Sequence, residues 1–426
     1  MNLYINVIIL ILAFSPIIDI IYTILYRFIG INLPIQQLIR AAIFAFLFLN
    51  IKRKKHKWVV LSLAILLAIG QVYIIINKYP FSLLNNFSFL IKILSLFCIL
   101  FYVKEKLVEK QITIKEIIGA FNISASILSI NIIISNIFKI GLQTYNYGNR
   151  YGYKGFIEAH NDVTVVLLML FPLLVYFYIK EKSKYSLINT IITAISLILI
   201  GPKAGKLLLL MEVVIFGIYY IVKNVNTLAR VKNIKLINYN RRIINSIGIL
   251  LTIMLCLVIY TNFNQVSNNI KNYVINKGYR SIYSYVVSYR DIQTVLIDNL
   301  IESQYNIHPK YQFGMGYYYT NKVLHEQKED FYMIENDIDG LIYYTGILTA
   351  SIILFILLVI TFRIVSIKNI NKELMFFIVT SVIISYIHSF LGGHVLYSAL
   401  ANTYLGTILG IGYFISDKKD INTGFK

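Results

Sequence analysis

The sequence predicts an all-α integral membrane protein, a polytopic bundle of about twelve transmembrane helices with one long extracytoplasmic loop. Three observations support this fold class. The 426 residues are 58% hydrophobic and only 14% charged, whereas about a quarter of the residues in a soluble domain are charged. The apolar residues form repeated blocks of about 20, the length that crosses a hydrocarbon core of about 30 Å. Because lipid offers the backbone no hydrogen-bond partners, these blocks must be helical.

The apolar blocks place the spans along the chain. The first, near 3–26, has no basic segment before it and no small-residue cleavage site after it, so we expect a retained helix and not a signal peptide. The other spans are expected near 34–51, 58–77, 83–103, 116–138, 162–179, 185–200, 203–222, 243–261, 338–362, 374–391 and 397–416. The chain is then a single membrane domain, 1–426, in which residues 262–337 form the long loop between the ninth and tenth spans.

The basic residues predict the orientation of the bundle. A net charge of +20 is also typical of nucleic-acid-binding proteins, but segments such as "KRKKHK" (52–57) and "KEKLVEKQITIK" (104–115) fall on one predicted side. Basic loops of membrane proteins are usually cytoplasmic. We therefore expect both termini in the cytoplasm and no nucleic-acid partner. The long outer loop is polar and rich in Tyr and Asn, and its apolar spacing predicts one or two amphipathic helices lying against the membrane.

An anion site is predicted where the eighth span begins, in "GPKAGK" (201–206). Pro202 suits the first turn of a helix, and the unpaired N–H groups of that turn attract anions. Lys203 and Lys206 are one turn apart, which places two positive charges on nearly one face. The alternative is that both lysines only extend to lipid headgroups.

A second polar segment, "NRYGYKGFIEAHND" (149–162), precedes the sixth span. Arg150 and Lys154 supply cations, and His160 is a candidate proton carrier. Asn161 and Asp162 are interpreted as helix caps more readily than as catalytic residues.

The long loop contributes a third group of polar residues. Its candidates are Arg280, Arg290, His308 and the segment "ENDIDG" (335–340) at the entrance to the tenth span. Three carboxylates in that segment, Glu335, Asp337 and Asp339, have a spacing that is not diagnostic of a metal site, and a role of Glu335 as a general base is at least as plausible. The alternative for His308 is an ordinary solvated loop residue.

Four ionisable residues are predicted inside spans, where charges usually face a partner or a cavity. Asp19 and Arg40 match in depth, as do Lys92 and Glu212, so we expect two structural ion pairs in preference to a proton relay. Two histidines near the predicted outer face, His388 and His394, receive no role from the sequence.

Four segments together resemble the O-antigen polymerase and O-antigen ligase superfamily, which includes the Wzy-type polymerases of capsule and exopolysaccharide pathways. The segments are "GFIEAHNDVTVVLLML", "LILIGPKAGKLLLL", "YRDIQTVLIDNL" followed by "FGMGYYY", and "ENDIDGLIYYTGILTA". They run in the order expected for the family, from about residue 148 to 350, and the twelve-span layout extends the likeness to the whole chain.

The resemblance implies a bacterial envelope enzyme that handles glycans carried on undecaprenyl diphosphate, without a metal or other cofactor. It implies that Arg290 matches the functional arginine of the family and that Lys203 or Lys206 replaces a second one. It also places Glu335 where a histidine is common. Lysine keeps the charge but loses the bidentate fork of arginine, and a glutamate can accept a proton but is not a cationic donor at neutral pH.

The predicted function is therefore polymerisation of lipid-linked oligosaccharide repeat units on the outer face of a bacterial cytoplasmic membrane. Arg290 is expected to stabilise the departing diphosphate, and Glu335 is the first candidate for the base, with His308 second. The residues expected to assist at the diphosphate are Arg150, Lys154, Lys203, Lys206 and Arg280. Those expected to contact the substrate elsewhere are His160, Asn161 and Asn336. A ligase acting on another acceptor, a flippase and a secondary transporter are the alternatives, and a chain-length regulator and a flippase are expected partners.

Overall fold

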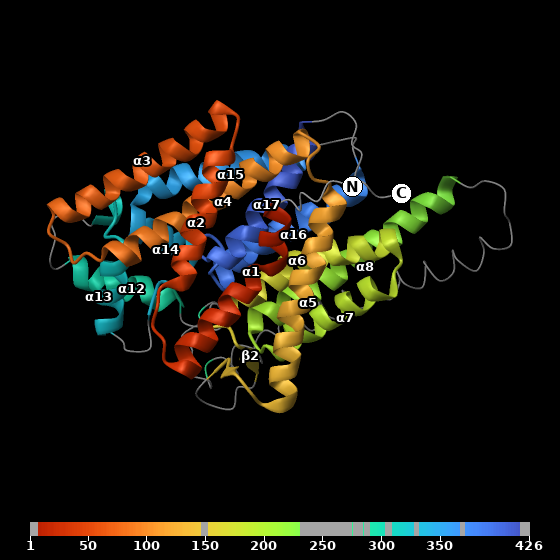
Figure 1. Ribbon diagram of the computed structural model, residues 1–426, viewed down its shortest axis with the longest axis horizontal. Helices are drawn as coiled ribbons and strands as arrows, with labels where there is room; N and C mark the ends of the chain where they lie inside the picture. The colour runs from red at the N-terminus through yellow and green to blue at the C-terminus, as the bar shows by residue number, and fades with distance from the viewer. Residues whose placement is uncertain are drawn as a thin grey trace. The chain divides into compact units, whose positions relative to one another are not determined.

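The computed structural model describes residues 7–145, 152–230, 275, 284, 290–302, 309–327, 332–366 and 371–417 (Figure 1). Its elements are α1 (Val7–Thr23), η1 (Ile24–Ile29), α2 (Ile35–Asn50), α3 (Lys54–Ile76), α4 (Leu83–Val108), α5 (Ile114–Phe138), β1 (Leu142–Gln143), β2 (Tyr153–Gly155), α6 (His160–Glu181), α7 (Lys184–Leu199), α8 (Lys203–Arg230), α12 (Arg290–Glu302), η2 (Pro309–Tyr311), α13 (Tyr317–Gln327), α14 (Asp337–Thr345), α15 (Ile347–Val365), α16 (Lys372–Leu391) and α17 (Ala399–Ser416).

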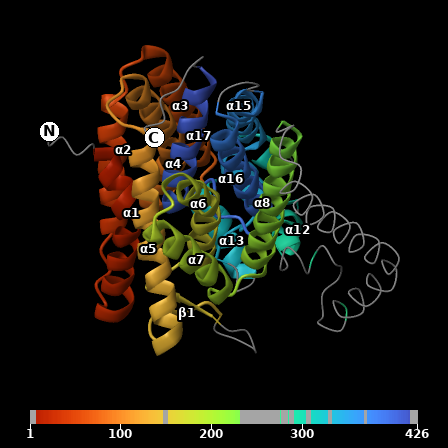
Figure 2. The same cartoon turned by 90° about the vertical axis from the view of Figure 1, so that its right-hand side faces the viewer.

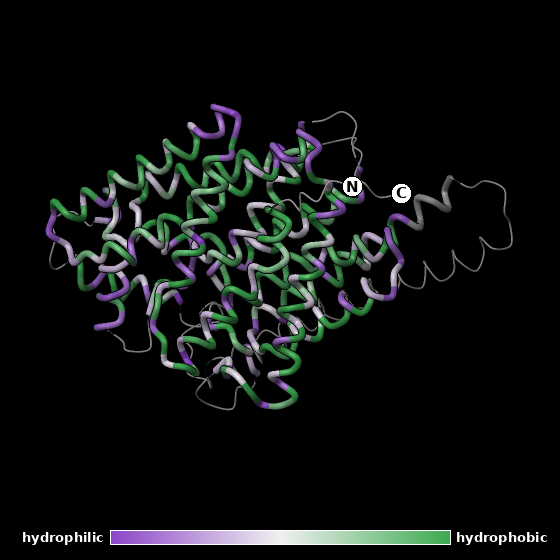
Figure 3. The backbone as a smooth tube through the Cα atoms, viewed as in Figure 1, coloured by the Kyte–Doolittle hydropathy of each residue, from purple (hydrophilic) through white to green (hydrophobic). Residues whose placement is uncertain are grey.

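These elements confirm the predicted polytopic all-α membrane fold. Among the described residues, 9 helices are long and apolar enough to cross a membrane. The shorter helices α2 and α7, with 16 residues each, coincide with two more predicted spans. The predicted span 243–261 lies outside the described residues. Figure 3 shows apolar residues running along the helices and hydrophilic residues gathered at many of their connections.

Two compact units divide the chain, and each is described by itself. The first contains residues 1–208 and 292–426, and the second contains residues 209–291. Glu212, in the second unit, has a fully buried side chain, and neither of its carboxylate oxygens has a hydrogen-bond partner among the described residues. All of the packing described below belongs to the first unit.

The expectation of a single helix over 338–362 is wrong, because the chain breaks at Gly346 between α14 and α15. Gly346 has φ 81°, which favours glycine, and a Cβ atom there would lie 2.1 Å from the carbonyl oxygen of Gln312. Gln312 directly precedes the turn "FGMG" (313–316). The backbone N–H groups of Met315 and Gly316 donate to the carbonyls of Tyr343 and Tyr344, at 2.8 and 3.1 Å. The turn thus satisfies two carbonyls that the break would otherwise leave without an intrahelical donor.

The centre of the first unit is formed by α17, which packs against α4, α6 and α16. Figures 1 and 2 both show α17 beside α4 and α16. Gly406 and Gly410 lie one helical turn apart on α17, and a Cβ atom on them would lie 2.7 and 2.8 Å from the carbonyls of Leu96 and Leu100 on α4. Small residues at this spacing let two membrane helices approach at backbone distance.

Replacing Gly410 by valine is expected to lower the free energy of unfolding by about 1–3 kcal/mol, the usual cost of overpacking a close contact. Thermal unfolding of the purified protein in detergent measures the change. Gly119→Val on α5 is the matched control, because a Cβ atom there meets nothing within 4 Å. An unfolding transition of Gly410→Val that coincides with those of the control and the wild type would contradict the close contact of α17 with α4.

The first span contains a proline whose effect on the helix is compensated by its neighbours. Pro16 has no N–H group to donate to the carbonyl of Leu12, four residues earlier. That carbonyl instead accepts hydrogen bonds from the hydroxyls of Ser124 on α5 and Tyr404 on α17, the latter at 3.1 Å. The three helices are therefore joined by polar contacts in an otherwise apolar core.

The contacts at the helix ends of the first unit form two groups, one on each predicted side of the membrane. On the predicted outer side, Arg27 pairs with Glu158 at 2.7 Å, and the ring of Tyr79 stacks on that of Tyr319. The predicted inner side contains the ion pairs Lys52–Glu109, Lys115–Glu181, Lys180–Glu373 and Lys104–Asp417. The predicted cytoplasmic position of this second group rests on its basic loops.

Candidate functional site

An ion pair between His394 and Asp162 lies at the predicted outer end of α6. The imidazole Nδ1 of His394 is 3.0 Å from Oδ1 of Asp162, and the two side chains are 15% and 19% exposed. The hydroxyl of Ser398 donates to Oδ2 of Asp162 at 2.5 Å. Asp162 belongs to the first turn of α6, whereas His394 and Ser398 belong to the turn between α16 and α17. A carboxylate on Nδ1 fixes the tautomer of a histidine and leaves Nε2 to exchange protons.

The turn that carries His394 is held by the buried carboxylate of Asp337, the first residue of α14. Its Oδ2 accepts hydrogen bonds from the Ser389 hydroxyl at 2.7 Å and from the backbone N–H groups of Val395 and Leu396 at 2.7 and 3.1 Å. Burial raises the pKa of Asp337 above its ordinary value, although these three hydrogen bonds lower it. The start of α14 therefore positions the turn.

Two further contacts fix this turn. His388, for which the sequence predicts no role, places its Nδ1 3.2 Å from the carbonyl oxygen of Gly393. Gly393 has φ 65° and packs directly on the backbone of Glu335, so a side chain at position 393 would collide with it. His394 also has a positive φ, of 66°, which is unusual for a residue other than glycine. The backbone around His394 is thus constrained on both sides.

Glu335, the base predicted from the sequence, lies in one cluster with His394, Asp162 and Asp337. It is half-buried, and its backbone N–H donates to the Gln293 side-chain oxygen on α12 at 3.0 Å. Its charge acts on the imidazole of His394. The next residue, Asn336, caps α14 by accepting hydrogen bonds from the N–H groups of Ile338 and Asp339 at 3.0 and 3.3 Å. Its side-chain oxygen is engaged in this cap, and its predicted contact with substrate stays a prediction.

The electrostatic balance at His394 favours the charged imidazole. Burial lowers the pKa of His394, but its contact with Asp162 and the charges of Asp162, Glu335 and Asp337 raise that pKa above the ordinary value. The imidazole of His394 therefore stays protonated to a higher pH than that of an unperturbed histidine, whose pKa is about 6.5.

One of the two predicted ion pairs inside the membrane is confirmed. The Arg40 guanidinium contacts both oxygens of Asp19, at 2.5 and 2.7 Å, and the Gln36 amide also donates to this carboxylate. Lys92 interacts electrostatically with Asp162 and Asp19 in the first unit. Glu212, its expected partner, belongs to the second unit, so that pairing stays a prediction.

The two lysines of "GPKAGK" occupy the first turn of α8, as predicted, with Gly201 at φ 104° before it. Both are half-buried, and each interacts with other groups of the protein. The turn packs on α6 at Gly205, where a Cβ atom would lie 2.7 Å from the Thr164 side chain. The first turn of α8, which carries both lysines, thus packs against α6, the helix that carries Asp162.

A short antiparallel hairpin, β1–β2, joins this region and was not expected from the sequence. The Thr144 hydroxyl donates to the carbonyl of Ile200 at 2.6 Å, which ties the hairpin to the turn before α8. Lys154 on β2 donates to the carbonyl of Glu158 at 2.5 Å, and burial lowers its pKa. The structure therefore brings Lys154, Lys203 and Lys206 to elements that contact one another.

The other candidates predicted from the sequence lie at the start of α6, at the start of α12 or outside the described residues. The interpretation of Asn161 and Asp162 as caps is wrong, because α6 begins at His160 and its N-cap is Ala159, without a side-chain cap. Asn161 is buried, and the ring of His160 lies 5.6 Å from that of Tyr145. Arg150, Arg280 and His308 lie outside the described residues. Arg290 is the first residue of α12 and belongs to the second unit.

Residues 1–281 match the family described as "O-antigen ligase like membrane protein". The chain belongs to this family. No curated protein and no solved structure matches the chain. Membership of the O-antigen ligase-like family confirms the resemblance predicted from the sequence and identifies the chain as a membrane protein with a role in processing lipid-linked glycans, of the glycosyltransferase type.

The residues that match the family include some of the candidate site residues and end before the others. Asp162, Lys203 and Lys206 lie within the matched residues, whereas Glu335 and His394 lie beyond them. His394 and Asp162 are the pair that sequence reasoning missed. The only signal for His394 was its position in a predicted outer loop after two glycines, and Asp162 was explained by its place at a helix start. Within the described residues, no three His, Cys, Asp or Glu side chains form a group able to hold a metal ion.

Proposed function

We propose that this protein polymerises oligosaccharide repeat units linked to undecaprenyl diphosphate on the outer face of a bacterial cytoplasmic membrane, with both termini in the cytoplasm. The product is a capsule, an exopolysaccharide or an O-antigen. The observation that carries the proposal is the His394–Asp162 ion pair, which lies in one cluster with Glu335. A glycosyl transfer to a sugar hydroxyl needs a group that accepts the hydroxyl proton, and this cluster offers two.

The second part of the proposed chemistry is the departure of the lipid diphosphate. As the glycosidic C–O bond breaks, negative charge builds on the lipid diphosphate, and fixed cations stabilise that charge more in the transition state than in the ground state. We assign this role first to Arg290. The assisting cations are Arg150, Lys154, Lys203, Lys206 and Arg280. The contacts among α6, α8 and the hairpin support a shared role for the three lysines.

Glu335 and His394 are the two candidates for the base that the structure describes. Glu335 is the first candidate from the sequence and stands where the family commonly has a histidine, while the orientation of His394 by Asp162 favours His394. His308, the second candidate from the sequence, lies outside the described residues.

The alternative within the same chemistry is a ligase that moves finished glycan to a different acceptor. A lipid-linked oligosaccharide flippase shares the pathway, but it does not need a proton acceptor. A flippase and a chain-length regulator of the same pathway are the proposed partners.

Deleting the gene is expected to leave surface glycan with single repeat units, because units still reach the outer face but are no longer joined. Electrophoresis of surface glycan from the deletion strain, with and without a plasmid-borne copy, measures this. Loss of attached glycan while long lipid-linked polymer accumulates would identify a ligase, and repeat units retained inside the cell would identify a flippase.

A further inference from the structure

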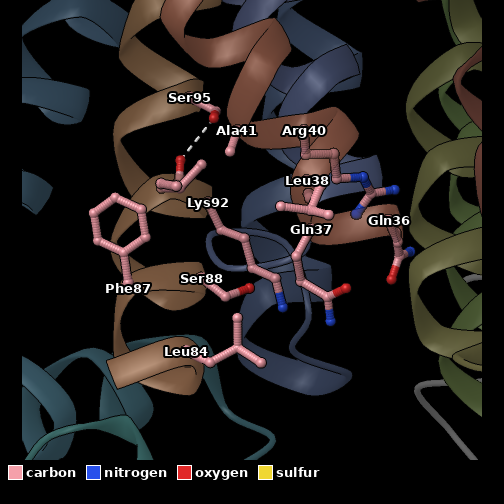
Figure 4. Close-up of a pocket in the computed structure, with 12 residues that line it drawn as sticks. Gln36, Gln37, Leu38, Arg40, Ala41, Leu84, Phe87, Ser88, Lys92 and Ser95 are labelled. Atoms are coloured by element: carbon pink, nitrogen blue, oxygen red, sulfur yellow. Dashed lines mark hydrogen bonds between the residues drawn. The ribbon is translucent and has the colours of Figure 1, made fainter. Parts of the chain in front are cut away.

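A pocket of about 110 Å³ opens between the predicted outer ends of α2 and α4, next to the start of α17. Its walls include the apolar side chains of Leu38, Leu84, Phe87 and Ile91. Figure 4 shows the Lys92 side chain extending from α4 toward Gln37 and Ser88, while Arg40 points away from it toward Gln36. The pocket therefore combines an apolar wall with one amine and several neutral polar groups.

The charges around this pocket leave Lys92 without a close counter-ion. Asp19 is paired with Arg40, and Asp162 is paired with His394. No ion pair within 4.0 Å involves Lys92 in the described part of the chain. An intramembrane charge is costly unless a partner or water compensates it, so an anion is the occupant that this pocket favours.

The depth of Lys92 indicates how such an anion arrives. Lys92 is nine residues after Leu83, the first residue of α4, which corresponds to about 14 Å along the helix. Side chains on a helix tilt toward its N-terminus, so the amine reaches back toward the predicted outer interface. A volume of about 110 Å³ is enough for a phosphate group.

We propose that the pocket between α2 and α4 binds the phosphate group of a membrane lipid through Lys92. The apolar wall then contacts the lipid chain, and the Gln37 side-chain N–H group and the Ser88 hydroxyl donate hydrogen bonds to the phosphate. The site goes beyond the proposed function, because it requires only an anionic lipid and does not depend on which glycan transfer the protein performs. Phospholipids and polyprenyl phosphates share this chemistry.

Native mass spectrometry of the full chain in detergent, with undecaprenyl phosphate or phosphatidylglycerol as the probe, tests the proposal. At least one of these lipids is expected to bind the wild type and to raise its melting temperature. Lys92→Met is expected to weaken that binding at least about tenfold, the loss expected for one charge-assisted contact, whereas Lys92→Arg retains it. The lipid that binds more tightly identifies the headgroup. Lys322→Met, which removes an exposed lysine of α13, is the matched control and is expected to bind like the wild type.

Three outcomes would overturn the proposal. Equal lipid binding by wild type and Lys92→Met would remove Lys92 from the site. An equal rise in melting temperature with inorganic phosphate would remove the lipid. A lower melting temperature of Lys92→Met in the absence of lipid would assign Lys92 a structural role, because an amine that awaits a ligand is not needed for folding.

Discussion

Replacing Asp162 by asparagine is expected to lower the rate of glycosyl transfer about 10²–10⁴-fold, the range by which a positioned acid or base accelerates a reaction. Asparagine preserves the shape of the side chain but removes the charge that orients His394 through Nδ1. The imidazole then loses its fixed tautomer, and Nε2 no longer reliably presents a lone pair to the acceptor hydroxyl. Turnover of a lipid-linked repeat unit by the purified protein in liposomes measures the effect.

The pH dependence distinguishes this role from a structural one. The contact and charge of Asp162 help to raise the pKa of His394, and a base acts only when deprotonated, so wild-type activity should rise with pH through that raised pKa. In Asp162→Asn the pKa of His394 falls, and the acidic limb of the profile moves to lower pH. Because the pKa of His394 is raised in the folded state, the pair stabilises the fold fully below about pH 6.5 and this stabilisation is lost as the pH rises through the raised value.

The control for Asp162→Asn is Asp339→Asn, the same substitution on α14 at a half-buried residue whose charge is not among those that act on His394. Its activity and profile should match the wild type. An Asp162→Asn protein with the wild-type rate and an unshifted acidic limb would exclude His394 as the base. Glu335→Gln measured in the same assay then shows whether Glu335 has that role.

Replacing Arg290 by alanine is expected to abolish polymer in cells while the protein still inserts at its normal level. Loss of one group that stabilises developing negative charge costs about 10²–10³-fold in rate, enough to leave single repeat units on the surface. Arg290→Lys should retain part of the activity, because lysine keeps the charge but not the bidentate geometry. Glycan electrophoresis, with the protein level measured by immunoblot, tests both variants.

Arg363→Ala is the matched control for Arg290. Arg363 is an arginine at the predicted inner end of α15, where it donates to the Tyr413 hydroxyl at 3.0 Å. Polymer should be normal in this variant. Wild-type polymer in Arg290→Ala would exclude Arg290 from the site. It would also exclude the match of Arg290 to the functional arginine of the family.

The sequence predicted those parts of the fold that depend on local composition. The bounds of α4, α5 and α6 agree with the predicted spans to within a few residues at nearly every end, because apolar blocks of membrane length are set by the hydrocarbon thickness. The Asp19–Arg40 pair could be predicted because two opposite charges at one depth have few other partners. The helix break at Gly346 could not, because it depends on the close approach of Gln312, a residue from the long loop.

The candidate site was predicted less completely for the same physical reason. Glu335, Lys203 and Lys206 stand out locally as charges beside apolar runs. The proposed role of His394 depends on its ion pair with Asp162, which is more than two hundred positions earlier in the chain. An aspartate at a helix start has an ordinary local explanation as a cap, so its long-range partner is visible only once the turn between α16 and α17 is folded.

The turn "FGMG" that closes on Gly346 also has a consequence for biosynthesis. In the predicted topology, the carbonyls of Tyr343 and Tyr344 receive their donors from an outer segment that crosses the membrane before α15 enters it. Insertion of that helix pair and completion of its backbone hydrogen bonding are therefore separate events. The junction between α14 and α15 therefore needs protection from lipid until this segment donates its hydrogen bonds to the two carbonyls.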